Sequence, residues 1–116
     1  MSQASGSAEY IYSSLAADPE LAEIVEMFIE EMPGRIANLL DHFNRQDWDG
    51  LRQTAHQLKG AAGSYGFETI SPSAAELEGV LRDGEPEHRV YEAITALVDL
   101  CGRVRAGTAA ANAPTL

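Results

Sequence analysis

Residues 55–67 read AHQLKGAAGSYGF, and this stretch decides both the fold class and the place of a candidate site. On a helix with about 100° per residue, its apolar side chains lie on one side and His56 lies on the other. The apolar side comprises Leu51, Ala55, Leu58, Ala62 and Tyr65. The strip within about 60° of His56 comprises Asp49, Arg52, Lys59, Gly60, Gly63 and Phe67. We therefore expect an amphipathic helix that buries its apolar side and exposes His56.

The segment before this helix contains a helix start signal and a helix-breaking residue. Asp18 can cap a first turn, and Pro19 lacks only an N–H that has no intrahelical partner there. Pro33 is expected to break or kink this helix, and a second apolar pattern follows over 36–43. A short additional helix is expected over 9–17. The predicted buried positions are Leu21, Ile24, Val25, Phe28, Met32, Ile36, Leu39, Leu40 and Phe43.

The remaining apolar patterns predict three helices. The helix with His56 is expected to begin at Asp47, an N-cap candidate, and to end near Tyr65. The next helix begins at Ser71 or near Glu68, and the last spans roughly 87–105 with a heptad-like apolar seam. The predicted buried positions are Ala74, Leu77, Val80 and Leu81, then Val90, Ile94, Leu97, Cys101 and Val104. No segment sustains a two-residue alternation, so no strand is expected.

These helices predict an all-α fold. Short connections between helices of similar length favour an antiparallel up-down four-helix bundle, with the short N-terminal helix as an addition. The chain of 116 residues suits one domain, which we place at 9–106. The small and polar segments at 1–8 and 107–116 are expected to be disordered tails.

Composition and charge exclude several functions. The net charge of −10 opposes binding to nucleic acid and to anionic membranes. No apolar run is long enough to span a bilayer, and the first residues lack the features of a signal peptide. Cys101 is the only cysteine, which excludes an internal disulfide and fits a reducing compartment. We therefore expect a cytoplasmic monomer.

The neighbours of His56 point to chemistry on a phosphoryl group. Lys59, the only lysine in the chain, follows one turn later, and Arg52 precedes His56 by one turn. Two cations beside a neutral imidazole suit an anion, although an ordinary ion pair with a nearby carboxylate is the simpler interpretation for Arg52. Gly60 and Gly63 each cost about 1 kcal/mol relative to alanine in a helix interior. They lie on the exposed strip, where the missing side chains leave room for another molecule to approach the imidazole.

Other chemistry has little support in the sequence. His42 and His88 have no metal-ligand spacing with His56, so no metal site is expected. Cys101 falls in the apolar seam and is interpreted as a core residue. The segment Gly60-Ala61-Ala62-Gly63 lies within a helix and follows no strand, so it is not a phosphate-binding loop. The chain has no room for an ATP-binding domain, so autophosphorylation is not expected.

The motif that starts at His56 resembles the histidine phosphotransfer (HPt) domain family of two-component phosphorelays. The resemblance rests first on the quoted stretch, which contains His-x-x-Lys-Gly, then small residues and a later Gly-Phe pair. It rests also on Leu77-Glu78 in the following helix. The resemblance covers about 9–105. It implies a four-helix up-down bundle with one phosphorylatable histidine, His56. Lys59 matches the residue that stabilises phosphoryl charge, and Gly60 the position kept small for docking.

The resemblance also implies partners and roles for further residues. The phosphoryl group would come from a receiver-domain aspartate of a response regulator or from a hybrid histidine kinase. Gly63, Arg52 and Ser64 would share the docking surface with Gly60, and Glu78 would orient the imidazole by accepting its second N–H. The receiver would supply the Mg²⁺, so this chain would be a phosphocarrier without a cofactor of its own. The alternative is a non-catalytic helical adaptor that keeps the same fold.

Overall fold

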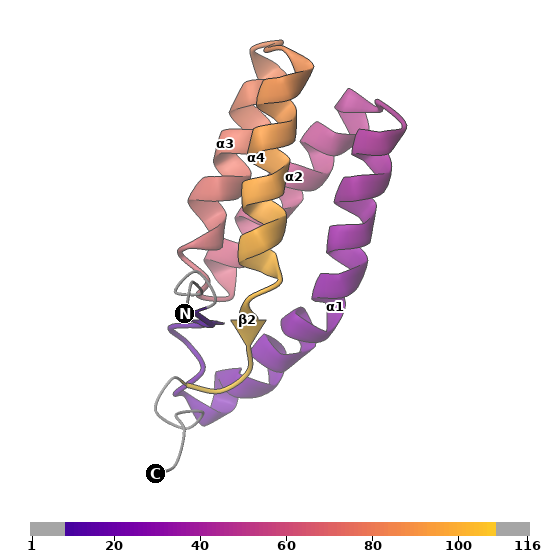
Figure 1. The fold of residues 1–116 in the computed structure, drawn as a ribbon. Helices are drawn as coiled ribbons and strands as arrows, with labels where there is room; N and C mark the ends of the chain where they lie inside the picture. Colours follow the sequence, from indigo (N-terminus) through magenta and orange to yellow (C-terminus); the bar gives the residue numbers. More distant parts are fainter. Residues whose placement is uncertain (1–8, 109–116) are drawn as a thin grey trace, which may run out of the picture.

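The computed structural model describes residues 9–108, which form a bundle of four helices with one short pair of strands (Figure 1). Loops of three to five residues join successive helices at alternating ends of the bundle (Figure 1). No helix in this part of the chain is long and apolar enough to cross a membrane. The elements in chain order are β1 (Ile11–Tyr12), α1 (Pro19–Asn44), α2 (Trp48–Ser64), α3 (Ile70–Arg82), α4 (Glu87–Cys101) and β2 (Val104–Arg105).

The predicted break at Pro33 does not occur, because α1 continues through this residue to Asn44. The two helices expected on either side of Pro33 are therefore one helix. Figure 1 shows that α1 is bent, which fits the hydrogen bond that a proline removes from a helix interior. Pro33 is exposed, so water can satisfy the carbonyl that loses its partner.

The ends of the helices follow local signals where a cap is present. Asp18 accepts from Glu20 N at 2.9 Å, and Asp47 accepts from Gly50 N at 3.0 Å. Both predicted N-caps are confirmed. The third helix begins at Ile70, between its two predicted starts. The last helix ends at Cys101, so its predicted extension to Arg105 is wrong, and Val104 lies in β2 instead.

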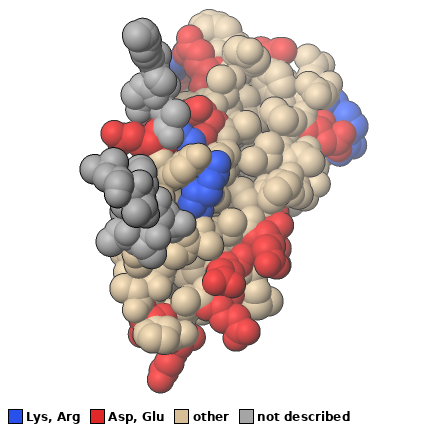
Figure 2. Space-filling model, turned by 60° about the horizontal axis from the view of Figure 1, so that its bottom comes forward, with Lys and Arg blue, Asp and Glu red and all other residues tan. Residues whose placement is uncertain are grey.

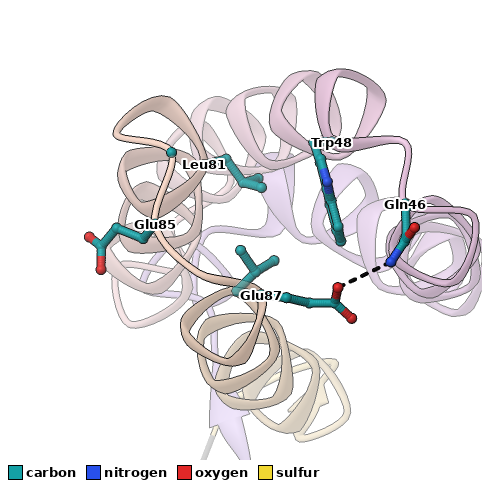
Figure 3. Close-up of a pocket in the computed structure, with 7 residues that line it drawn as sticks. Gln46, Trp48, Leu81, Glu85 and Glu87 are labelled. Atoms are coloured by element: carbon teal, nitrogen blue, oxygen red, sulfur yellow. Dashed lines mark hydrogen bonds between the residues drawn. The ribbon is translucent and has the colours of Figure 1, made fainter.

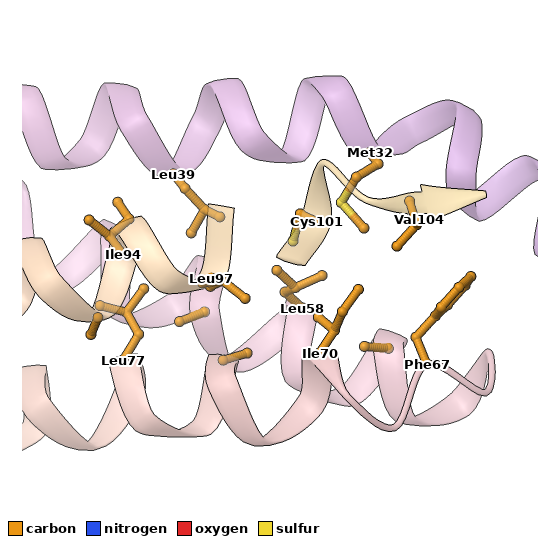
Figure 4. Close-up of a cluster of buried hydrophobic side chains, with 14 of the residues drawn as sticks. Met32, Leu39, Leu58, Phe67, Ile70, Leu77, Ile94, Leu97, Cys101 and Val104 are labelled. Carbon is orange, nitrogen blue, oxygen red and sulfur yellow. The ribbon is translucent and has the colours of Figure 1, made fainter. Parts of the chain in front are cut away.

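The core lies between the helices and contains most of the predicted apolar positions (Figure 4). Three predicted positions are exceptions: Leu21 is only half-buried and lies outside the core cluster, and Ile24 and Leu40 are each 40% exposed. Ile24 and Leu40 each lie about 100° around the helix from a buried neighbour, Val25 or Leu39, and therefore fall at the edge of the side of α1 that faces the core. Phe67 was expected on the strip of His56, but it is fully buried.

The segment 9–17, which we call the N-terminal strap, is not the expected helix. Its residues Ile11–Tyr12 pair in parallel with Val104–Arg105, although no strand was predicted. Ser14 N then donates to Gly66 O at 2.9 Å, and the Ser13 hydroxyl donates to the carbonyl of Tyr65. The strap therefore connects β2 to the loop between α2 and α3.

The surface is strongly acidic. Figure 2 shows acidic side chains spread over the end of the molecule with the strands, where basic side chains occupy small areas. This distribution agrees with the net charge of −10. The predicted tails at 1–8 and 107–116 lie outside the described residues, apart from 107 and 108.

Candidate functional site

His56 lies near the middle of α2 and projects from the bundle. Its side chain is 64% exposed, and its Nδ1 atom lies 2.8 Å from Oε2 of Glu78 on α3. A neutral imidazole that donates its Nδ1–H to this carboxylate carries its lone pair on Nε2. The contact therefore leaves Nε2 as the nucleophilic atom.

Glu78 also holds the lysine that the sequence singles out. Lys59 Nζ lies 2.8 Å from Oε1 of Glu78, so the two oxygens of one carboxylate contact the two side chains. The hydrogen bond from Lys59 lowers the pKa of Glu78 below its ordinary value, and the bond from His56 adds to this effect. Partial burial opposes the shift, since the side chain is only 17% exposed. Glu78 is therefore a carboxylate at neutral pH.

A third contact joins α2 to α3 at this site. The Ser71 hydroxyl donates to the backbone carbonyl of Lys59 at 3.0 Å. The sequence marks Ser71 as a cap candidate, and only the packing of α3 against α2 shows this second role. Because Ser71 and Glu78 lie on the same helix, α3 holds both the backbone and the ammonium group of Lys59.

The two glycines of α2 leave open space on the exposed strip. A Cβ atom at Gly60 would meet no atom within 4 Å, and one at Gly63 would meet Ser71 Oγ at 3.7 Å, an ordinary contact. Packing within the chain therefore requires neither glycine. Their helical cost is consistent with the predicted clearance for a second molecule.

The other predicted docking residues lie at the borders of this strip. Arg52 pairs with Asp49 at 3.0 Å, which is the ordinary ion pair that the sequence left open for it. Ser64 is exposed at the last position of α2, about 12 Å along the helix axis from His56. Among the described residues, no hydrogen bond joins Ser64 to His56, Lys59 or Glu78, so Ser64 belongs only to the surroundings of the site.

A shallow hollow of about 270 Å³ lies beside the imidazole. It is lined by Arg52, Gln53, His56, Gln57 and Glu78. Sequence reasoning missed the two glutamines. Their positions on the helix, about 60° and 100° from His56, were the available signal. A group attached to the imidazole would therefore have amide donors nearby.

The remaining candidates lie apart from His56. His42 Nδ1 lies 3.1 Å from Oδ2 of Asp47 at the turn between α1 and α2, and His88 is exposed on α4. Within residues 9–108, no group of three or more His, Cys, Asp and Glu side chains could hold a metal ion. Burial raises the pKa of the Cys101 thiol to about 12, which keeps the thiol protonated within the core.

The fold and site define a class of protein: a helical bundle with one exposed imidazole that a carboxylate of the neighbouring helix contacts. Comparison with known families agrees, since the model described as Hpt domain matches residues 23–107. The chain therefore belongs to the Hpt domain family, whose members are phosphocarriers of two-component signalling and interact with receiver domains and histidine kinases. No curated protein and no solved structure matches the chain.

Proposed function

We propose that this chain is a histidine phosphotransfer protein of a two-component phosphorelay, with His56 as its phosphoacceptor. The observation that carries this proposal is the contact of Nδ1 with Glu78, which leaves the exposed Nε2 atom available. In the transfer, the Nε2 lone pair forms a bond to phosphorus while the bond to the carboxylate oxygen of a receiver aspartate breaks. The reverse step passes the phosphoryl group to a second receiver.

The charges around His56 suit this transfer. Attack by Nε2 develops positive charge on the ring, and the Glu78 carboxylate at Nδ1 stabilises it. Lys59 neutralises charge on the phosphoryl oxygens, since its ammonium group is held within the same site and is 36% exposed. The carboxylate and the ammonium group therefore act on opposite charges of one reaction.

The open strip of α2 supplies the docking surface for the partner. Gly60 and Gly63 let a receiver approach the imidazole, and Arg52 and Ser64 lie at the edges of the contact. The receiver brings the Mg²⁺ ion and most of the catalytic groups, because phosphoryl transfer depends mainly on positioning and charge neutralisation. The chain works as a cytoplasmic monomer and needs no cofactor of its own.

Incubation with a panel of phosphorylated receiver domains tests the proposal. The wild-type chain should gain an acid-labile, base-stable phosphate, and His56→Gln should gain none. His88→Gln is the matched control, because His88 is an exposed histidine on another helix and should leave labelling unchanged. Wild-type labelling of His56→Gln contradicts the proposal. A wild-type chain that binds receivers without becoming labelled would favour the adaptor alternative.

A further inference from the structure

A second hollow lies at the end of the bundle away from the strands. It has a volume of about 290 Å³ and lies between the loop that follows α1 and the loop that follows α3 (Figures 1 and 3). This volume is close to the lower limit of ordinary ligand pockets, about 300 Å³. Trp48, one of its lining residues, precedes His56 by about 12 Å along the axis of α2, so the hollow is separate from the phosphotransfer site.

The floor of this hollow is apolar and aromatic. Figure 3 shows the side chains of Trp48 and Leu81 pointing into it, and Val90 is a buried lining residue. The ring of Phe43 packs edge-on against Trp48 with a centroid distance of 5.7 Å. The indole is therefore held in place and is half-buried rather than fully covered.

The carboxylate of Glu87 lies at the edge of this hollow, near the indole of Trp48 (Figure 3). Oε1 of Glu87 accepts from Gln46 Nε2 at 3.1 Å, a contact that joins the loop after α1 to the start of α4 (Figure 3). Gln46 has a φ of 55°, which residues other than glycine rarely adopt. Oε2 of Glu87 has no hydrogen-bond partner among the described residues. One oxygen thus fixes the carboxylate, and the other can accept a ligand.

The lining favours a positive ligand. None of the residues that line the hollow is basic. Glu85 points away from the hollow in Figure 3 and pairs with Arg89 at 3.2 Å. An aromatic face attracts an alkylated ammonium group, and aliphatic side chains pack against its alkyl groups. The acidic surface of the molecule also raises the local concentration of cations.

We propose that this hollow binds a small organic ammonium cation with apolar substituents. The cationic group lies against the indole of Trp48 and next to the free oxygen of Glu87. Its substituents contact Leu81 and Val90. The site is independent of phosphoryl transfer at His56, so this ligand could bind the carrier in either phosphorylation state.

Trp48 is the only tryptophan in the chain, so its fluorescence and its indole N–H resonance both report on this hollow. The probe is choline, and the matched neutral compound is 3,3-dimethyl-1-butanol, in which carbon replaces the charged nitrogen. Titrations of the full chain at constant ionic strength should saturate with choline. The dissociation constant of choline should be about tenfold lower than that of 3,3-dimethyl-1-butanol. Only choline gains the interactions of a cation with the indole and with the carboxylate.

Two variants of similar chemistry complete the test. Glu87→Gln should weaken choline binding several-fold, whereas Glu85→Gln should leave it unchanged, because the Glu87 carboxylate lies near the indole of Trp48 and that of Glu85 points away from the hollow. Circular dichroism should show that both variants keep the helical content of the wild type. Equal affinity for choline and the alcohol, unchanged affinity in Glu87→Gln, or no saturable response by either method up to tens of millimolar choline overturns the proposal.

Discussion

The Glu78 carboxylate connects the two side chains on which the proposed reaction depends. It contacts both His56 and Lys59 at 2.8 Å, so the resting chain already holds the imidazole and the ammonium group in one arrangement. A phosphoryl group on Nε2 carries more negative charge than a carboxylate and competes with Glu78 for Lys59. The exposed position of Lys59 allows its Nζ atom to turn toward that group.

Lys59→Ala should separate the chemical role of this lysine from its structural role. We expect transfer from a phosphorylated receiver to slow by about ten- to a hundredfold, because a charge-stabilising donor is lost. The free energy of unfolding should change by only about 1 kcal/mol, because Lys59 itself is partly exposed and the Glu78 carboxylate, which is 17% exposed, keeps its contact with His56. Stopped-flow transfer assays and urea unfolding measure the two effects. Arg45→Ala removes another exposed, ion-paired cation and should leave transfer unchanged. An equal effect of both variants would contradict a specific role for Lys59.

Glu78→Gln should change how stability depends on pH. The pKa of Glu78 is lowered in the folded chain from an ordinary value of 4.5, mainly by Lys59. A lowered pKa means that the carboxylate stabilises the folded state above about pH 4.5 and that this contribution is lost as the pH falls through the folded value. Wild type should therefore be more stable than Glu78→Gln near pH 7, with a smaller difference near pH 3.5. Urea unfolding at both pH values checks this. A difference that does not shrink in acid would show that the carboxylate charge is not the cause.

The helices show which parts of the fold local sequence signals can predict. The expected range from Asp47 to Tyr65 lies within one residue of α2, because a capping aspartate and a regular apolar pattern mark it. At Pro33 the same reasoning allowed a break or a kink, and the separate helix that it placed after this residue was wrong. The ring of Pro33 is exposed, and the neighbouring Met32 packs in the core. This packing holds α1 together on both sides of the proline, so the helix bends there and continues. Whether proline ends or bends a helix depends on packing that the local pattern does not contain.

The exposed glycines of the helices allow a paired test of the docking surface. Gly60 in α2 and Gly34 in α1 both lie within helices, and a Cβ atom at either would meet nothing within 4 Å. Alanine at either position should stabilise the chain by about 0.5–1 kcal/mol, because glycine is a poor helix former. Thermal unfolding measures this gain.

The larger side chain in Gly60→Gln should also slow transfer from a receiver, because it enters the space beside His56. Gly34→Gln is the control with the same chemistry on another helix, and its transfer rate should equal that of wild type. Equal transfer rates for both glutamine variants would remove the argument that Gly60 keeps the docking surface clear.

Contacts between residues far apart in the sequence join the N-terminal strap to the rest of the bundle. The N-terminal strap pairs with β2, and its serines bond to carbonyls of the loop after α2, 52 residues away. These contacts explain the wrong prediction of a helix over 9–17. Ser13 Oγ accepts from Leu15 N at 2.9 Å and holds a turn, which competes with helix formation. The part of the candidate site on α2 was predictable from local spacing, and Glu78 on α3 from the family resemblance. The contact of Ser71 with Lys59 and the pairing of the strap with β2 required the folded chain.

Gly66 is the residue on which the strap depends most directly. Its φ of +83° lies in the left-handed region, and a Cβ atom there would lie 2.5 Å from Ser13 Oγ and 2.9 Å from Leu15 Cγ. Gly84 has a similar φ of +67°, but its Cβ would meet no atom within 4 Å. Gly84→Ala should thus cost about 1 kcal/mol from backbone conformation alone. Gly66→Ala should cost at least about 1 kcal/mol more, because the strap must also move.

Urea unfolding of the two alanine variants measures this difference directly. The same substitutions in a chain that begins at Asp18 isolate its cause, because that chain lacks the serines and the leucine that crowd Gly66. The two costs should then become equal, since only the backbone conformation remains. If Gly66→Ala and Gly84→Ala lower the free energy of unfolding of the full chain equally, the strap can move away from residue 66 without loss of stability. A larger cost for Gly66→Ala that persists in the shortened chain would place its origin in the turn itself, whose carbonyls and buried Phe67 close this end of the core.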